Sequence, residues 1–144
     1  MKEFIDNIWN YHGSAIVVIT TNGPATRTGK AALGNGCSRQ AGRKFPGLAE
    51  RLGASLAKQG NHVPYLGNDI VSFPVEHSSF ENPDLKFIER STRELVSLVD
   101  QMGWDSVVVP RPGCGGGGLS WKKVNPILEK YFDDRFLVIA KQES

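Results

Sequence analysis

Residues 111–119, Arg-Pro-Gly-Cys-Gly-Gly-Gly-Gly-Leu, have the composition of a loop that binds an anion. Gly113, Gly115 and Gly118 follow the spacing G-x-G-x-x-G. Because glycine has no Cβ, successive backbone N–H groups can turn toward one anion, and the N-terminus of a following helix adds partial positive charge. A loose turn would not require so many glycines between an apolar strand and a helix. The contacts expected from this loop are Gly113, Cys114, Gly115, Gly116, Gly117, Gly118 and Leu119.

A second short loop, Gly34, Asn35 and Gly36, also precedes a segment with helical character. Its backbone amides and the helix N-terminus can face a phosphate in the same way. Asn22 ends a long apolar run and can donate to a sugar hydroxyl, although a simple turn asparagine explains it equally well. Two such loops after two strands suggest a diphosphate held from both sides.

Two other phosphate-binding motifs fit less well. A dinucleotide-binding Rossmann unit shares the glycine spacing, but it needs a second strand with an acidic residue at its end and then more sheet, and the sequence stops at Ser144 directly after the next strand. Residues 23–31 (GPATRTGKA) resemble a P-loop, yet five residues separate Gly23 from Gly29, and Ala31 replaces the magnesium-binding Ser or Thr. We therefore expect neither a Rossmann cofactor site nor a nucleotide triphosphatase.

No further chemistry-bearing cluster emerges from the sequence. The histidines at 12, 62 and 77 lack metal-ligand spacing, and two cysteines are too few for a disulfide scaffold. Cys114 is expected to be a small buried cysteine rather than a nucleophile. We expect no metal and no cofactor.

Length and composition favour one globular domain over residues 1–144, with 40% apolar and 22% charged residues. The net charge of +2 does not indicate nucleic-acid binding. Arg39, Arg43 and Lys44 come nearest to a basic patch, and a solvated helix face explains them better. Because the N-terminal residues resemble no signal peptide and no apolar run approaches about 20 residues, we expect a cytoplasmic protein without a membrane span.

The pattern of apolar residues along the chain predicts that these loops lie between strands and helices. Residues 15–21, 106–110 and 136–140 are short apolar runs, as in buried strands. Residues 37–58 predict two helices separated at Phe45-Pro46, and Ser120 predicts the start of a last helix. In that last helix we expect Trp121, Val124, Leu128 and Tyr131 to face inward.

The middle of the chain predicts a strand pair and a long helix. Residues 63–66 and 70–75 read as strands around Gly67-Asn68. Residues 83–102 predict a helix with Asn82 as its N-cap and Gly103 as its C-terminal stop. Its expected inward face comprises Leu85, Ile88, Thr92, Leu95, Val99 and Met102.

This alternation predicts an α/β fold with a mostly parallel sheet and helices on both faces. Ligands bind such sheets beyond the carboxyl ends of the strands.

Four stretches together resemble the macrodomain superfamily: residues 16–22 (IVVITTN), 34–36 (GNG), 44–47 (KFPG) and 109–121 (VPRPGCGGGGLSW). The likeness is greatest to small phage and bacterial macrodomain-like proteins. The chain is also similar to the branch of DNA-ADP-ribose glycohydrolase antitoxins and ADP-ribosyl-glutamate hydrolases. The stretch P-R-x-G-C-G-x-G-G-L-x-W is the most specific part, and the resemblance covers nearly the whole chain.

The resemblance implies a three-layer α/β/α fold with a mostly parallel mixed sheet that binds ADP-ribose. Asn22 would contact the distal ribose, Thr21 beside it would be a further ligand contact, and the two glycine loops would hold the diphosphate.

The resemblance also implies an adenine site near the N-terminus. Asn7 occupies the acidic position of a Gly-Asp-Ile-type motif, whose carboxylate accepts from the adenine amino group, while Asp6 stands one place earlier. Ile8 completes the motif. Trp9 is expected either to stack near adenine or to lie in the core.

Two departures from that branch affect catalysis. Its glycohydrolases tend to have a lysine after an F-P-x motif, whereas Phe73-Pro74-Val75 is followed here by Glu76 and His77. Its glutamate hydrolases have an aspartate in the second glycine loop, and the matching position here is Gly117. With both absent, Glu76 or His77 is the candidate general base.

The sequence thus predicts a protein that binds ADP-ribose or an ADP-ribosylated macromolecule, and it leaves turnover open. One alternative is a hydrolase that acts on ADP-ribose 1''-phosphate or releases ADP-ribose from a modified macromolecule. Another is a nucleic-acid-binding module using Arg39, Arg43 and Lys44. We expect a monomer that meets nucleic acid only as a modified substrate.

Overall fold

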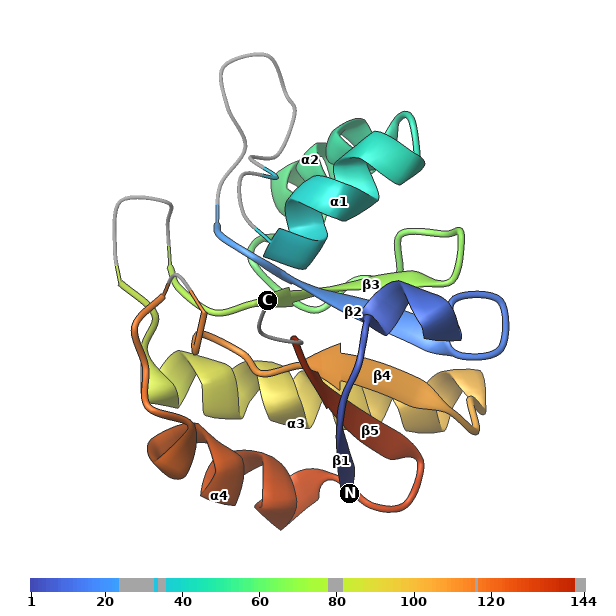
Figure 1. Cartoon of the computed structure of the whole chain (residues 1–144). Coiled ribbons are helices and arrows are strands. Elements are labelled where there is room, and N and C mark those ends of the chain that lie inside the picture. Colours follow the sequence, from blue (N-terminus) through green and yellow to red (C-terminus); the bar gives the residue numbers. More distant parts are fainter. Residues whose placement is uncertain (24–32, 34–35, 78–81, 116, 142–144) are drawn as a thin grey trace.

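A parallel five-stranded sheet forms the centre of the computed structural model, which describes residues 1–23, 33, 36–77, 82–115 and 117–141 (Figure 1). The strand order is β1-β5-β4-β2-β3, and every paired strand is parallel. The strands are β1 (Lys2–Ile5), β2 (Ile16–Thr21), β3 (Ile70–Pro74), β4 (Val107–Pro110) and β5 (Phe136–Ala140). The predicted α/β class with a mostly parallel sheet is confirmed, and the described strands pair in parallel throughout.

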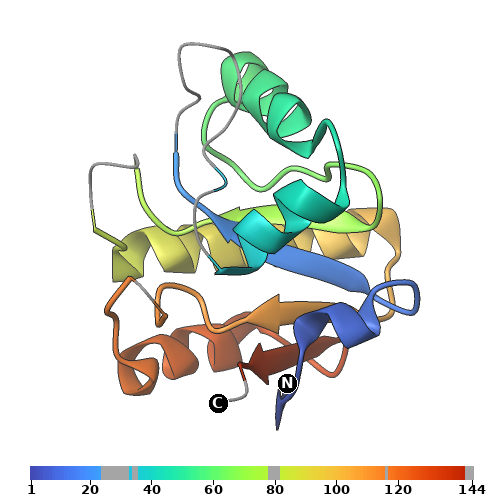
Figure 2. The ribbon, with the colours of Figure 1, turned by 45° about the horizontal axis from the view of Figure 1, so that its top comes forward.

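Helices cover both faces of the sheet (Figures 1 and 2). They are the short 3₁₀ helix η1 (Ile8–Tyr11), α1 (Gly36–Lys44), α2 (Leu48–Gln59), α3 (Leu85–Met102) and α4 (Trp121–Tyr131). Alternate side chains of β2 divide between the two faces, as the two-residue period of a strand requires. Val17 and Ile19 pack with α1 and α2, whereas Ile16 and Val18 pack with α3 and α4. Within the described residues, no helix is long and apolar enough to cross a membrane.

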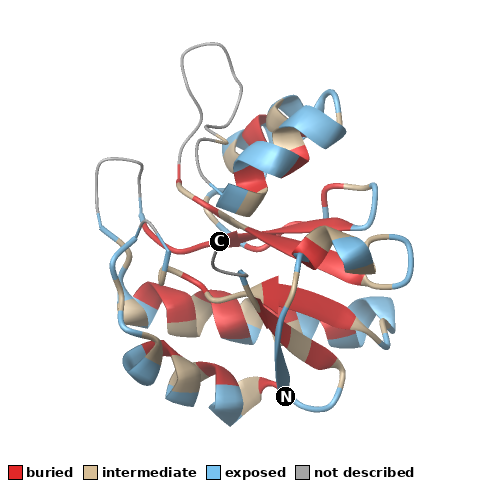
Figure 3. Ribbon diagram, in the orientation of Figure 1, coloured by how far each residue is buried: buried red, intermediate tan, exposed pale blue. Residues whose placement is uncertain are grey.

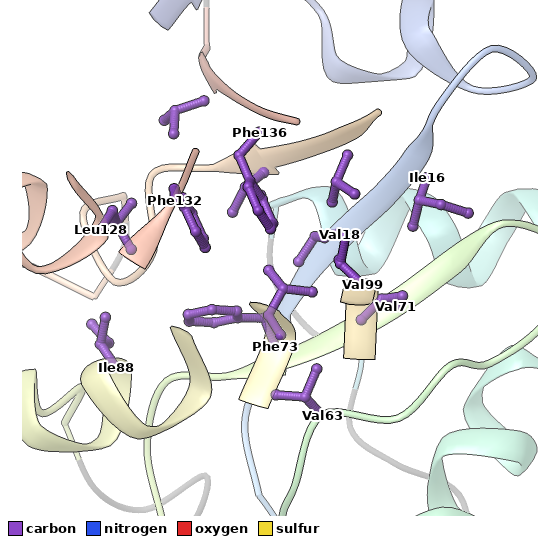
Figure 4. Packing of buried hydrophobic residues seen from close by; sticks show 14 of the residues in the cluster. Ile16, Val18, Val63, Val71, Phe73, Ile88, Val99, Leu128, Phe132 and Phe136 are labelled. Atoms are coloured by element: carbon purple, nitrogen blue, oxygen red, sulfur yellow. The ribbon is translucent and has the colours of Figure 1, made fainter. Parts of the chain in front are cut away.

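The larger core cluster lies between the sheet and the pair α3–α4 (Figure 4). Phe132 and Phe136 stack with ring centroids 4.1 Å apart, and the side chain of Phe73 on β3 is completely buried in the same cluster. Figure 3 shows the buried residues concentrated along β2 to β5 and on the inner sides of the helices, whereas β1 is exposed. Close packing of this kind makes the sheet a rigid base for the loops that follow it.

The chain segments that follow the neighbouring strands β2 and β4 lead to opposite faces of the sheet. After β2 the next helix is α1 on one face, whereas after β4 the next helix is α4 on the other. The two connections therefore separate at the carboxyl ends of adjacent strands, and such a separation creates a crevice that binds ligands in open α/β sheets.

The long helix begins later than the sequence predicted. The Asp84 carboxylate accepts the backbone N–H of Lys86 at 2.8 Å, so Asp84 is the N-cap and the helix starts at Leu85. Asn82 as the N-cap was therefore wrong, because the carboxylate nearer the helix satisfies its free N–H groups. Met102, expected to face inward, is exposed in the last turn.

The predicted strand 63–66 is not a strand. Tyr65 forms a single antiparallel bridge with Val71, and Asn68 and Asp69 have φ angles of 53° and 59° in the turn that follows. Pro64 cannot donate to a strand ladder, which limits pairing in this segment. The other predicted helices and strands agree with the observed ranges within about two residues, which is the usual uncertainty of boundaries, whereas β1 and η1 were not predicted.

Candidate ligand cleft

A cleft of about 1160 Å³ opens at the carboxyl ends of the five strands. Its lining includes residues from the end of each strand: Asp6, Asn7 and Ile8 beyond β1, Thr20 and Asn22 at β2, Val75 and Glu76 beyond β3, Pro110 and Arg111 at β4, and Ile139, Ala140 and Lys141 at β5. This ligand cleft includes the crevice between the connections that leave β2 and β4, the position expected for a ligand in such a sheet.

The glycine loop after β4 forms one wall of the cleft. The Leu119 N–H donates to the Gly113 carbonyl at 2.9 Å and closes the loop. Gly113 has a φ angle of +72°, and a Cβ added there would lie 2.8 Å from Leu119 Cδ1. A Cβ at Gly117 would lie 2.6 Å from Pro83 Cγ, whereas a Cβ at Gly115 would meet nothing within 4 Å. The loop is therefore packed tightly at Gly113 and Gly117 and open at Gly115.

Most predicted contacts from this loop line the cleft. They are Gly113, Cys114, Gly115, Gly117 and Leu119. Gly118 is not among the lining residues; it has a φ angle of +77°, and its N–H donates to the Gly115 carbonyl at 3.3 Å. Gly116 lies outside the described residues.

The start of α1 forms the facing wall. Gly36 begins this helix with a φ angle of +51°, and Gly36, Cys37 and Ser38 all line the cleft. Gly34 and Asn35, predicted to contact phosphate, lie outside the described residues. The described part of this wall thus brings the N-terminus of a nine-residue helix to the same cleft as the glycine loop.

The segment after β1 supplies a polar cluster at one end of the cleft. Asp6 accepts the Asn7 backbone N–H at 2.7 Å, the Tyr11 hydroxyl at 3.0 Å and the Asn10 side-chain amide at 3.0 Å. These hydrogen bonds, led by that of Asn7, lower the pKa of Asp6. Asn7 Oδ1 accepts the Trp9 N–H at 3.0 Å, which caps η1. Both Asp6 and Asn7 line the cleft beside the buried Ile8.

Trp9 packs against α1 and is not among the described residues that line the cleft. Its indole Nε1 donates to Gln40 Oε1 at 2.7 Å, and its ring lies 6.1 Å from that of Phe45. Lys44 Nζ is 5.4 Å from the Trp9 ring centroid. These contacts support the packing role predicted as an alternative to adenine stacking.

At the end of β2, Asn22 and Thr20 line the cleft. The predicted contact Thr21 instead directs its hydroxyl to Ser72 Oγ on β3, 2.7 Å away and buried. Successive side chains of a strand point to opposite faces, which accounts for the difference between Thr20 and Thr21.

Glu76 follows β3 near the end of β2. The Val75 N–H donates to the Thr21 carbonyl at 3.1 Å, so Glu76 is one residue beyond the last hydrogen bond between these strands. It is 5% exposed and lines the cleft. His77 is exposed, and its ring packs edge-on against Phe87 at 4.5 Å rather than lining the cleft.

Two cysteine side chains also line the cleft. Cys37 and Cys114 are both free thiols, and burial raises the pKa of each. The positive charge of Arg111 lowers the pKa of Cys114, but by less than burial raises it. We therefore expect both thiols to be protonated near pH 7, and Cys114, predicted to be a small buried cysteine, is half-buried. The described residues contain no group of three potential metal ligands.

The sequence did not single out Arg111 and Trp121 as site residues, although both line the cleft. The Arg111 guanidinium lies 4.7 Å from the Trp121 ring centroid. Their ten-residue spacing is present in the quoted glycine-loop motif, but sequence spacing alone does not give the direction of either side chain.

Solved structures of macrodomains have the same fold as this chain. The macrodomain of Mycobacterium tuberculosis DarG aligns over 99% of this chain and 97% of its own, with a TM-score of 0.78 and 20% identity. The macrodomain of Thermus aquaticus DarG aligns over the same shares, with a TM-score of 0.77 and 18% identity. Thermosipho africanus DarTG, solved in complex with ADP-ribose, aligns over 88% of this chain and 37% of its own, with a TM-score of 0.69 and 20% identity.

One curated relative is similar in sequence. The DNA ADP-ribosyl transferase-DNA ADP-ribosyl glycohydrolase fusion protein of Thermosipho africanus (strain H17ap60334) is 33% identical over 82 residues. The match covers 56% of this chain and 21% of that relative, so this chain spans about a fifth of the relative's length. No family model matches the chain.

Proposed function

Because this chain has the fold of the macrodomain superfamily, we propose that its ligand cleft binds ADP-ribose or a group that carries it. The observation that carries the proposal is the pairing of two anion-binding features across one crevice. The glycine loop after β4 forms one wall and the N-terminus of α1 the other. A diphosphate between them would receive backbone N–H groups from both sides.

The two ends of the cleft suit the two ends of ADP-ribose. The β1–β5 end combines the apolar side chains of Ile8 and Ile139 with polar groups of Asp6 and Asn7, which suits a flat base with a hydrogen-bonding edge. The β2–β3 end offers Asn22 and Glu76, which suit the hydroxyl groups of the distal ribose. The Thermosipho africanus neighbour was solved in complex with ADP-ribose, which supports the choice of this ligand.

Isothermal titration calorimetry tests the proposal. We expect 1:1 binding of ADP-ribose with a Kd in the micromolar range, and weaker binding of AMP and ATP as controls. A protein that binds none of the three at millimolar concentration would contradict ADP-ribose recognition, and the similarity would then extend to the fold alone.

A second candidate function is hydrolysis of ADP-ribose derivatives, favoured by the position of Glu76. Within the described residues, only two carboxylates line the cleft, Asp6 at the β1 end and Glu76 beside Asn22. The aspartate that the related hydrolases have in the glycine loop would not fit here, because a Cβ at Gly117 would meet Pro83 and lie 2.7 Å from the Gly113 carbonyl oxygen. Glu76 is thus the candidate general base for a water that attacks the distal ribose.

Product release from ADP-ribose 1''-phosphate and from ADP-ribosylated nucleic acid or protein tests this candidate. We expect Glu76→Gln to reduce any turnover by about 100-fold or more while ADP-ribose still binds, because an amide cannot accept the proton. His77→Ala serves as a comparison, and we expect it to retain turnover because its ring lies outside the cleft lining. Turnover that survives Glu76→Gln would remove Glu76 from the reaction.

A further inference from the structure

The protein itself provides few hydrogen-bond partners for the donors of the Arg111 side chain. A guanidinium has five N–H donors. Within the described residues, the only ion pair of Arg111 is with Glu3, and its Nη2 to Oε1 distance of 3.9 Å exceeds that of a hydrogen bond. Its Nε–H is buried without a hydrogen-bond partner. Leaving a buried donor unpaired costs free energy, so the hydrogen bonds of the folded protein do not explain an arginine at this position.

Stacking on Trp121 accounts for the orientation of the guanidinium. The Cζ atom of Arg111 lies 4.7 Å from the indole centroid, within the range of a cation–π contact. Trp121 is the first residue of α4 and also packs against the core cluster, so it has a fixed position at the edge of the cleft. An arginine held over such a ring loses little side-chain freedom when its remaining donors meet a ligand.

Arg111 also stands at the start of the glycine loop. Its backbone carbonyl accepts the N–H of Cys114 at 3.3 Å, so the loop turns back beside it. Among the described lining residues, the cations are Arg111 and Lys141, and the carboxylates are Asp6 and Glu76. These four charges cancel, so without Arg111 the cleft would carry a negative balance against an anionic ligand.

We propose that Arg111 is a ligand-binding residue, whose guanidinium, held on Trp121, donates hydrogen bonds to the diphosphate of the bound ligand. This inference rests on the proposed function and adds a charged contact that the backbone loops do not provide. Charge-assisted hydrogen bonds from arginine to phosphate oxygens are among the stronger polar contacts, and two can form in parallel.

The test compares ADP-ribose with adenosine, which lacks the diphosphate. We expect Arg111→Gln to raise the Kd of ADP-ribose roughly 10- to 100-fold and to leave the Kd of adenosine unchanged in an NMR titration. The affinity for ADP-ribose should also depend less on salt concentration, because one phosphate contact is lost. Arg93→Gln is the matched control: it removes the same charge from an exposed position of α3 outside the cleft lining.

Milder variants keep the test valid if Arg111→Gln disturbs folding. Arg111→Lys retains the charge but loses the planar fork, so we expect an intermediate Kd. Trp121→Phe keeps an aromatic face and should bind almost as the natural protein does, whereas Trp121→Leu should weaken binding of ADP-ribose. Melting curves by circular dichroism identify any variant that is unfolded.

Different failures have different meanings. If the natural protein does not bind ADP-ribose at all, the proposed function fails and the inference fails with it. If the natural protein binds but the Arg111 variants bind equally well, only the inference is overturned. Equal losses for ADP-ribose and adenosine would also overturn it, because Arg111 would then act on the base or on the shape of the cleft.

Discussion

The Asn7 side chain offers a bound adenine other hydrogen-bonding groups than a carboxylate would. Its single side-chain oxygen already accepts the Trp9 N–H at 3.0 Å, and the other terminal atom of an amide is an NH₂ donor. A carboxylate at this position could cap η1 with one oxygen and accept from the adenine 6-amino group with the other. We therefore expect the natural protein to distinguish adenine weakly from a purine with an oxygen at that position.

Asn7→Asp is expected to strengthen binding of ADP-ribose by roughly five- to tenfold, because the NH₂ donor of the amide would be replaced by a carboxylate oxygen that can accept from the 6-amino group. Calorimetry with ADP-ribose and inosine diphosphate ribose gives the selectivity of each variant, and the ratio should shift toward ADP-ribose. Gln101→Glu makes the same charge change at an exposed position of α3. An unchanged ratio would show that Asn7 does not contact the base edge.

The two cysteines provide a direct reporter of cleft occupancy. Burial raises the pKa of Cys37 and of Cys114, so both should react slowly with iodoacetamide at pH 7 and faster as the pH rises and thiolate forms. Because both line the cleft, saturating ADP-ribose should slow the reaction further, measured for each residue by mass spectrometry. Equal rates with and without ADP-ribose would place the ligand elsewhere.

Single residues show where sequence reasoning succeeds and where it stops. The number and spacing of the glycines pointed to the loop that lines the cleft, since glycine permits backbone conformations that other residues rarely adopt. Thr21 was chosen instead of Thr20, because the face that each strand side chain occupies depends on how β2 lies in the sheet. Arg111 went unassigned because its partner Trp121 becomes a neighbour only after the loop folds back.

At the scale of elements, two glycines of the loop after β4 are expected to have different roles, one in the stability of the fold and the other in ligand binding. Gly113 has a φ angle of +72°, and a Cβ added there would lie only 2.8 Å from Leu119 Cδ1, whereas Gly115 has open space around it and no positive φ. Substitution of the first should strain the fold. Substitution of the second should leave the free protein intact and put a methyl group where a phosphate can approach the backbone.

We expect Gly113→Ala to lower the free energy of unfolding by about 1–3 kcal/mol, the usual range for a residue forced into such a conformation. Gly115→Ala should unfold like the natural protein but bind ADP-ribose roughly tenfold more weakly, which corresponds to about 1.4 kcal/mol. Urea denaturation and calorimetry on the same samples measure the two effects. If Gly113→Ala is as stable as the natural protein, the close packing of this loop is wrong.

The boundaries of other elements depended on contacts that a sequence does not contain. The break between α1 and α2 was predictable, because Pro46 cannot continue a helix. Strand β1 was not predicted, because all four of its residues are exposed and it lacks the apolar run of a central strand. Its pairing with β5 is nevertheless what brings Asp6 and Asn7 to the cleft.

At the scale of the whole molecule, the alternation of strands and helices predicted a parallel sheet but not the strand order. That order places β2 beside β4 and lets their connections reach opposite faces. The cleft consequently draws on the ends of all five strands and on helices from both layers. A ligand bound there would connect parts of the chain that are far apart in sequence, so its binding should stabilise the fold as a unit.

Thermal unfolding measures this coupling. A ligand that binds only the folded state at about 100 times its Kd adds about 2.7 kcal/mol to the free energy of unfolding. For a domain of this size, that corresponds to a rise in Tm of roughly 5–10 °C. We expect ADP-ribose to produce such a rise, and AMP at the same concentration to produce less, since AMP reaches only part of the cleft.

Gly115→Ala should need about ten times more ADP-ribose for the same shift, because its affinity for ADP-ribose is lower while its own Tm is retained. A Tm that rises equally with AMP would mean that the diphosphate and distal ribose contribute nothing, and the crevice between β2 and β4 would then not be the centre of the site.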